Sequence, residues 1–156
     1  MDVTAAEIVR NGEVFLGVEL GSTRIKAVLI DAKCNVIAQG SYAWENHFDV
    51  MYWSYHQDEI WRGLRSAYTD LRQRVEKRCG ISIQRVAVMG ISGMMHGYLA
   101  FDTAGNLLVP FRTWRNNTTG EAAEELTRVL GFNIPERWSV AHLYQALLSG
   151  ETHVAQ

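Results

Sequence analysis

The sequence contains little cysteine, little proline and no long hydrophobic run. Two of its 156 residues are cysteine and two are proline. Cys34 and Cys79 are far apart in the chain and form neither a Cys-x-x-Cys pair nor a zinc-binding spacing, so neither a disulfide framework nor a zinc site is expected. No apolar segment approaches the roughly 20 residues of a membrane span, and the first residues do not resemble a signal peptide. We therefore expect a cytoplasmic protein with reduced thiols.

Neither sign of charge is in excess. The chain has 15 Lys and Arg against 17 Asp and Glu, a formal net charge of −2, and 47% of its residues are hydrophobic. This balance gives no electrostatic reason to expect nucleic acid or an anionic membrane as a partner. No repeat or linker divides the sequence. We expect a single domain over residues 1–156, with residues 1–12 as a disordered or extended lead-in.

One segment combines an apolar strand with a turn of small residues. Residues 14–18 and 25–30 are short, apolar and β-prone, which places residues 21–23, Gly-Ser-Thr, at the tip of a hairpin. Backbone amides and hydroxyls in such a turn can bind an anion, and Lys26 adds a positive charge. Gly-Ser-Thr is also ordinary hairpin chemistry. The turn alone does not distinguish a phosphate site from a hairpin without a ligand.

Glu19 strengthens the phosphate interpretation. This carboxylate stands among apolar residues near the end of the first strand, where burial is costly unless a cation or hydrogen bonds compensate for it. A phosphate-bound Mg²⁺ would provide that compensation. An ion pair with Arg24 or Lys26 is the structural alternative.

The middle of the chain predicts a mixed α/β order. Residues 36–38 continue a third strand, so the chain opens with a three-stranded antiparallel meander. Residues 43–56 contain five aromatic side chains but no clean period. We expect a loop there, whose aromatic rings either fill the edge of the core or stack on sugar rings. Helical spacing over residues 58–79 predicts a crossover helix, and the apolar run 86–91 predicts a strand covered on both faces.

The last part of the chain predicts two more helices. Residues 118–121, Thr-Thr-Gly-Glu, form a capping box for a helix that Gly131 ends. Ser139 can cap a second helix, which Gly150 ends. His142 lies in this second helix, where a histidine without an identified partner is more often structural than functional.

The end of the strand at residues 86–91 is a second candidate site. In open α/β sheets ligands gather beyond the carboxyl ends of strands, and here two glycines flank His96. A histidine can donate or accept a hydrogen bond, which suits a sugar hydroxyl. The alternatives are a buried, hydrogen-bonded His96 and core packing of Met94 and Met95.

Four segments in this order resemble motifs of the FGGY carbohydrate kinases, in particular of the xylulokinase-like members. Residues 17–23 resemble their first phosphate motif, Asp-x-Gly-Thr/Ser. Residues 53–58 resemble their Trp-x-Glu-Gln-Asp segment, and residues 93–97, Gly-Met-Met-His-Gly, resemble Gly-Gln-Met-His-Gly. Residues 107–117 resemble their proline-then-tryptophan segment. Together the four motifs are far more specific than any one of them.

The resemblance implies a ribonuclease-H-like lobe of the actin, sugar-kinase and heat-shock ATPase superfamily, an α/β fold with helices on both faces of a mixed sheet. It also implies ATP-dependent phosphorylation of a sugar hydroxyl, with ATP and Mg²⁺ as cofactors. The chain would be the N-terminal, sugar-binding lobe of a two-lobed kinase, inactive without the catalytic base and the adenosine site. The implied partners are a pentulose or related polyol or ketose and the C-terminal lobe of the same protein. A homodimer is compatible with this picture.

The resemblance also implies residue roles. Glu19 would organise Mg²⁺ through water. Met94 replaces a glutamine and Asn116 a frequent aspartate, so the sugar stays open. Glu19 replaces the usual aspartate, which changes the geometry of the carboxylate toward the metal. The departures at Glu19 and Asn116 are what one alternative predicts, a short non-catalytic sugar-binding or assembly module. A two-metal nuclease is set aside because the fourth strand ends without a carboxylate. The residues implied near the phosphoryl group are Gly21, Ser22, Thr23 and Lys26, and those implied at the sugar are Met95, His96, Trp114 and Asn116.

Overall fold

The computed structural model describes residues 3–155, and the chain divides into two compact units. Unit 1 is Met1–Glu45 with Gln57–Met94, and unit 2 is Asn46–His56 with Met95–Gln156. The single lobe expected from the sequence stays a prediction. None of the described helices combines the length and the apolar character needed to cross a membrane.

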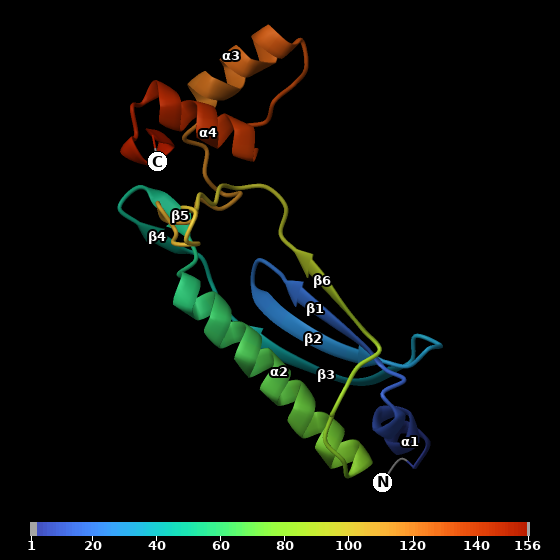
Figure 1. Ribbon diagram of the computed structural model, residues 1–156. Coiled ribbons are helices and arrows are strands. Elements are labelled where there is room, and N and C mark those ends of the chain that lie inside the picture. The colour runs from blue at the N-terminus through green and yellow to red at the C-terminus, as the bar shows by residue number, and fades with distance from the viewer. Residues whose placement is uncertain (1–2, 156) are drawn as a thin grey trace. The chain divides into compact units, whose positions relative to one another are not determined.

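Unit 1 is built on a four-stranded sheet in the order β3-β2-β1-β6 (Figure 1). Strands β1 (Phe15–Leu20), β2 (Arg24–Ile30) and β3 (Val36–Ala43) form an antiparallel meander. Strand β6 (Val88–Gly93) follows a helix and pairs in parallel with β1. The meander, the crossover and the mixed sheet confirm the fold class predicted from the sequence.

Helix α2 (Gln57–Cys79) packs on one face of this sheet, against β2 and β3 (Figure 1). Its buried positions include Ala67, Leu71 and Val75, which follow the helical spacing seen in the sequence. A Cβ atom on Gly40 of β3 would lie 2.2 Å from the carbonyl oxygen of Ala67. Strand and helix therefore meet backbone to backbone.

The first helix was not predicted. Residues 3–11, expected to be disordered or extended, form helix α1 (Val3–Asn11). Ala5, Ala6 and Val9 are buried, and Gly12 follows the helix with a φ of +71°. A helix of this length depends on tertiary packing more than on local propensity, so its sequence signal is weak.

Strand β6 is exposed, whereas the sequence predicted a strand covered on both faces. All six of its residues are exposed, and Ile91 keeps 68% of its accessible surface. The apolar run identified the strand correctly. It could not reveal that helix α2 lies over β2 and β3 and leaves β6 uncovered.

Unit 2 begins with a hairpin that the sequence did not predict. Strands β4 (His47–Asp49) and β5 (Tyr52–Ser54) pair antiparallel within the segment expected to be a loop. Val50, in the turn between them, has a φ of +56° and is 99% exposed. Strands of three residues are too short to establish a period of two.

The rest of unit 2 contains helices α3 (Gly120–Leu130) and α4 (Ser139–Leu148) and the short 3₁₀ helix η1 (Thr152–Ala155). Helix α3 ends at Gly131, which has a left-handed φ of 62° as predicted. Its N-cap residue Thr119 makes no capping hydrogen bond, because its hydroxyl donates to the carbonyl of Glu136 at 2.6 Å. Ser139 is the first helical residue of α4, and its hydroxyl donates to the carbonyl of Gly97 at 2.7 Å. Hydroxyls expected to cap helices bind loops instead.

Candidate functional site

Glu19 and Lys26 face each other across strands β1 and β2. The strand register pairs them, and Nζ of Lys26 donates to Oε2 of Glu19 at 2.9 Å. Lys26 alternates with Ile25 and Ala27, which are buried, so the pair lies on the sheet face opposite α2. Their side chains are about half exposed, 49% for Glu19 and 53% for Lys26. Glu19 is therefore not the buried carboxylate that the sequence predicted, and it forms the ion pair that the structural alternative named.

The turn after β1 is held by backbone hydrogen bonds and by Trp44. The N–H of Gly21 donates to the carbonyl of Arg24 at 3.1 Å. The indole N–H of Trp44 donates to the carbonyl of Gly21 at 2.7 Å, and its backbone N–H donates to Thr23 at 3.2 Å. Because the Gly21 amide is used within the turn, an anion bound here would meet the amides and hydroxyls of Ser22 and Thr23.

A hollow of about 520 Å³ opens on the sheet in unit 1. Cavities of this size hold small-molecule ligands in other proteins. Its lining includes the Glu19–Lys26 pair and Ser92, which is aligned with Glu19 in the β1–β6 register. Charged and polar groups are thus placed on an otherwise largely apolar surface formed by β1, β2 and β6.

Glu19 fits a limited role toward Mg²⁺. Within residues 3–155 no group of three or more His, Cys, Asp and Glu side chains gathers. Mg²⁺ usually keeps several waters and takes one or two protein carboxylates together with phosphate oxygens. A single exposed carboxylate therefore fits a contact through water and does not form a complete protein site.

Strands β1 and β6 end side by side. Leu20 is aligned with Gly93, and the N–H of Met94 donates to the carbonyl of Leu20 at 3.1 Å. The turn at 21–23 and the chain leaving β6 start from the same edge of the sheet, which is where α/β proteins place their ligands. Residues 95–97 belong to unit 2, so a cleft shared by the two loops stays a prediction.

In unit 2 a pair of backbone hydrogen bonds joins two segments predicted to contact sugar. The N–H of Tyr98 donates to the carbonyl of Arg112 at 2.8 Å, and the N–H of Arg112 donates back at 3.1 Å. His96 and Trp114 each lie two residues beyond this antiparallel bridge. The structure therefore brings their two segments next to each other.

His96 is held in an unusual backbone conformation. Its φ is +73°, in the left-handed region that few residues other than glycine adopt, and its imidazole stacks on Trp138 with 6.2 Å between ring centroids. A Cβ atom on the next residue, Gly97, would lie 2.6 Å from the carbonyl oxygen of Arg112. Residues in such conformations cluster at functional sites. Beside His96, the side chain of Met95 is 74% exposed.

Asn116 binds the backbone of unit 2. Its Oδ1 accepts the N–H of Trp53 at 2.8 Å, and its Nδ2 donates to the carbonyls of Trp53 and Thr113 at 2.8 and 2.9 Å. The residue is 4% exposed. An aspartate could not donate these two hydrogen bonds, which explains an asparagine here. Asn116 thus positions β5 against the segment that carries Trp114.

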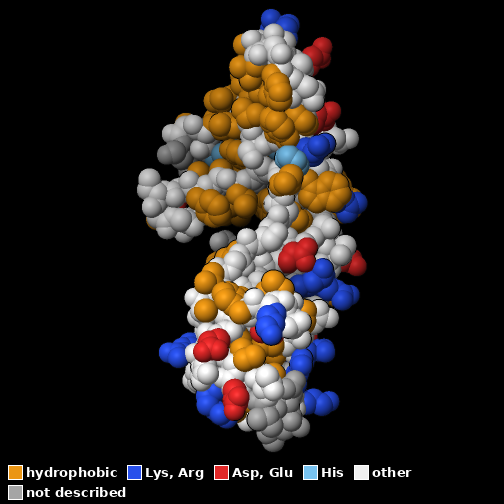
Figure 2. Space-filling model, turned by 90° about the vertical axis from the view of Figure 1, so that its right-hand side faces the viewer, with side chains coloured by type: hydrophobic (Ala, Val, Ile, Leu, Met, Phe, Trp, Pro, Cys, Tyr) orange, Lys and Arg blue, Asp and Glu red, His pale blue; other side chains and the backbone are white. Residues whose placement is uncertain are grey.

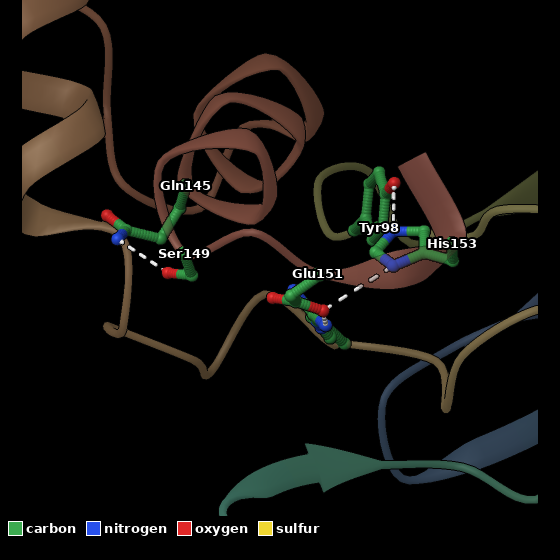
Figure 3. Close-up of polar contacts among 6 residues, drawn as sticks. Tyr98, Gln145, Ser149, Glu151 and His153 are labelled. Carbon is green, nitrogen blue, oxygen red and sulfur yellow. Dashed lines mark hydrogen bonds and ion pairs between the residues drawn. The ribbon is translucent and has the colours of Figure 1, made fainter. Parts of the chain in front are cut away.

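A buried ionic cluster in unit 2 was not predicted. Arg112 is 3% exposed and forms an ion pair with Glu151. Figure 3 shows His153 between two partners: its Nδ1 lies 3.5 Å from Oε2 of Glu151, and its Nε2 lies 2.8 Å from the hydroxyl of Tyr98. The Arg112 guanidinium also lies over the ring of Tyr52, 4.3 Å from its centroid. These residues are far apart in sequence, so no local spacing could have revealed them.

His142 lies beside this cluster. It has no accessible surface, and neither ring nitrogen has a hydrogen-bond partner among the described residues. Its ring stacks on Tyr98, with 6.1 Å between centroids. Burial, and then the positive charge of Arg112, lower the pKa of His142 to about 4. The imidazole is therefore neutral near pH 7, in line with the structural role expected for it.

Three comparisons relate this chain to known proteins. The family model described as the FGGY family of carbohydrate kinases, N-terminal domain, matches residues 14–138. A glycerol kinase from Thermococcus gammatolerans is 27% identical over 118 residues, which cover 74% of this chain and 23% of that protein. A xylulose kinase from Lactococcus lactis is 26% identical over 122 residues, covering 78% and 24%.

The fold also matches solved structures. A xyloylose kinase from Brucella ovis matches with a TM-score of 0.78 at 20% identity, over 92% of this chain and 31% of that chain. This likeness concerns the fold alone. The chain spans about a quarter of the length of the curated relatives named above, which are 23% and 24% covered.

Proposed function

This chain belongs to the FGGY family of carbohydrate kinases, and we propose that it is the N-terminal, substrate-binding lobe of an enzyme that transfers the γ-phosphoryl group of ATP to a sugar or polyol hydroxyl. The observation that carries the proposal is the Tyr98–Arg112 bridge, which brings the segments of His96 and Trp114 together. The relatives named above act on glycerol and on xylulose, as their names state. A polyol or a ketose is therefore the substrate class.

The substrate contacts lie in unit 2. His96 offers a ring nitrogen to a substrate hydroxyl, since its imidazole is only partly buried. Met95 and Trp114, 74% and 42% exposed, offer apolar surface to the C–H groups of the substrate. Asn116 affects the substrate indirectly, because its hydrogen bond to the carbonyl of Thr113 fixes the segment that carries Trp114. Substrate binding thus uses hydrogen bonds for orientation and apolar contact for affinity.

The phosphoryl-binding groups lie in unit 1. Mg²⁺ bound with ATP neutralises charge on the phosphoryl oxygens. Glu19 would hold a water of that ion, and Ser22, Thr23 and Lys26 would donate to the transferring group, with Gly21 shaping the turn. Such positioned donors are the main requirement of phosphoryl transfer. The Lys26 ammonium donates to Glu19 at 2.9 Å, which holds it on the same sheet face as that carboxylate.

The activity requires more polypeptide than this chain. The catalytic base and the adenosine site belong to the part of the kinase that follows the matched region, so we expect the 156-residue chain to be inactive alone. We place the enzyme in the cytoplasm. Cys34 and Cys79 form no disulfide within residues 3–155.

Substrate binding tests the role of His96. Isotope-labelled chain is titrated with xylulose and with glycerol, and binding is followed by NMR chemical shifts. We expect His96→Ala to weaken binding of the preferred compound by about tenfold or more, the effect of losing about 1.4 kcal/mol. His56→Ala is the matched control, because His56 is an exposed histidine of the same unit. Equal affinities for the parent chain and His96→Ala would remove His96 from the site.

A non-catalytic sugar-binding module is the second candidate. The Glu19–Lys26 ion pair favours it, because the carboxylate already has a partner. The gene sequence beyond codon 156 separates the two candidates. A longer polypeptide whose sugar-dependent ATP turnover falls in Glu19→Gln supports the kinase. Sugar binding with no ATP turnover by the natural full-length product supports the module.

A further inference from the structure

His96 has a backbone conformation that its neighbours must maintain. Its φ is +73°, and a residue other than glycine adopts this left-handed conformation at an energetic cost. Such a conformation persists where the surrounding contacts leave the residue no alternative. The contacts around His96 therefore show which residues keep its imidazole in place.

The next residue, Gly97, is held through both of its backbone polar groups by residues 137–139. The N–H of Gly97 donates to the carbonyl of Arg137 at 2.8 Å. The carbonyl of Gly97 accepts the hydroxyl of Ser139 at 2.7 Å. Gly97 is buried, so these hydrogen bonds satisfy groups that water reaches poorly. Both peptide groups that flank Gly97 are thus fixed, and the first of them is the peptide that leaves His96.

The imidazole of His96 is supported by the same segment. The ring of Trp138 is nearly parallel to it, with an interplanar angle of 14° and 6.2 Å between centroids. Trp138 in turn packs against the apolar cluster of Ala123, Ile134 and Ala141. The position of the tryptophan is therefore set by the packing of α3 and α4.

We propose that Ser139 is a positioning residue for His96: its hydroxyl fixes the carbonyl of Gly97 on the first turn of α4 and so keeps the imidazole in its binding orientation. The inference rests on the proposed function, in which His96 binds a substrate hydroxyl. Ser139 acts through Gly97 and needs no contact with the substrate. The bond from Arg137 uses its backbone, whereas that of Ser139 uses a side chain, so a substitution can remove it.

NMR of the isotope-labelled 156-residue chain tests the proposal, with the ring signals of His96 as the first measurement. Their absence from the spectrum of His96→Ala assigns them. We expect Ser139→Ala to shift these signals and the amide signal of Gly97, because the carbonyl of Gly97 loses its hydroxyl donor. Ser139→Thr keeps a hydroxyl and should resemble the parent chain. Ser149→Ala is the matched control, since Ser149 is an exposed serine at the other end of α4.

Substrate affinity is the second measurement, with xylulose and glycerol as the probes. Ser139→Ala should bind the preferred compound about fivefold more weakly, the effect of one hydrogen bond. Ser139→Thr and Ser149→Ala should bind it like the parent chain. All three variants should keep the circular dichroism spectrum of the parent, because both serines are exposed. A loss of stability alone would leave the affinity of the folded chain unchanged, so affinity separates positioning from a purely structural role.

Unchanged His96 ring signals in Ser139→Ala would overturn the proposal. An affinity equal to that of the parent chain would do the same, as would a loss that Ser139→Thr shares in full. Failure of the proposed function looks different: the parent chain then binds neither compound, or His96→Ala binds as tightly as the parent. In both of those cases the His96 ring signals decide by themselves whether Ser139 holds that residue.

Discussion

Unit 1 and unit 2 differ in how many polar side chains they bury. Within the described residues, the buried side chains of unit 1 are apolar and pack around α2 and the sheet. Unit 2 buries an ionic and polar set beside an apolar cluster of Ala123, Ile134 and Ala141. Figure 2 shows further hydrophobic side chains on its surface around α3 and α4. The buried polar residues are Ser54, Arg112, Thr113, Asn116, Thr119, His142 and His153.

This difference predicts two kinds of sensitivity. Unit 1 depends on the fit of apolar and backbone surfaces, which hardly responds to pH but tolerates no added atoms. Unit 2 depends on buried groups whose charge and hydrogen bonds must be satisfied. Changes of packing should therefore affect unit 1 most, and changes of protonation unit 2.

The largest effect is expected where strand and helix of unit 1 touch. In Gly40→Ala the new Cβ would lie 2.2 Å from the carbonyl oxygen of Ala67 and 2.3 Å from the amide nitrogen of Leu71. Backbone atoms cannot move aside, so we expect a loss of at least about 4 kcal/mol in the free energy of unfolding. Urea unfolding followed by circular dichroism measures it. Gly90→Ala, on β6 with nothing within 4 Å, should change stability by less than about 0.5 kcal/mol. Similar losses in both variants would contradict the close contact.

A smaller effect should come from pH in unit 2. The folded state holds the pKa of His142 at about 4, below the ordinary histidine value of 6.5, so the unfolded chain binds more protons between these values. Stability is therefore complete above about pH 6.5 and falls as the pH drops toward 4. Between pH 7 and pH 5 the loss should be about 2 kcal/mol.

The control for this pH effect is His142→Phe, which keeps a ring beside Tyr98 but cannot titrate. Its free energy of unfolding should change much less between pH 7 and pH 5. Asp31, Asp70 and Asp102 also have lowered pKa values, so their protonation costs stability at lower pH. An unchanged pH dependence in the variant would show that another group causes the loss.

Each unit contains a turn of the same type, so the two turns can be compared residue by residue. Asp31 in unit 1 and Asp102 in unit 2 each accept, on Oδ1, the backbone N–H groups two and four residues later, and on Oδ2 the side-chain amide of the asparagine four residues later. The fourth position of the turn has a positive φ in both. It is Cys34, with a φ of +63°, in unit 1 and Gly105, with a φ of +83°, in unit 2.

The smallest predicted effect follows from this turn. Cys34→Gly should raise the free energy of unfolding by about 1 kcal/mol, because glycine adopts the left-handed conformation without strain. Gly105→Ala should have the opposite sign and a similar size, since its Cβ would meet nothing within 4 Å and only backbone strain would change. Thermal unfolding of the two variants checks both signs. Equal signs would mean that φ does not decide the difference.

The sequence predicted those parts of the fold whose signal is local. The β1–β2 hairpin and β6 are marked by short apolar runs, and α2 is marked by apolar residues at helical spacing over several turns. The strands of the β4–β5 hairpin are too short for a period. Solvent exposure also escaped prediction, because an apolar run such as that at β6 identifies a strand but not what covers it.

The candidate site was partly predictable for the same reason. The segments of His96 and Trp114 were identified from motifs, and the structure adds the backbone bridge that joins them. The Glu19–Lys26 pair was foreseen as an alternative, whereas the exposure of Glu19 was not. The contacts of Arg112 with Glu151, and of Tyr98 with His153, join residues 39 and 55 positions apart. Only the folded chain reveals such pairs.

Through these contacts, the C-terminal end of the described chain is attached to the backbone bridge beside the candidate sugar site. Glu151 holds Arg112 and His153 holds Tyr98, the two residues whose backbones form the bridge beside His96 and Trp114. A displacement of residues 151–153 would therefore move Arg112 through its ion pair with Glu151 and Tyr98 through its hydrogen bond with His153. We therefore expect movement of the tail to shift the segments that carry His96 and Trp114.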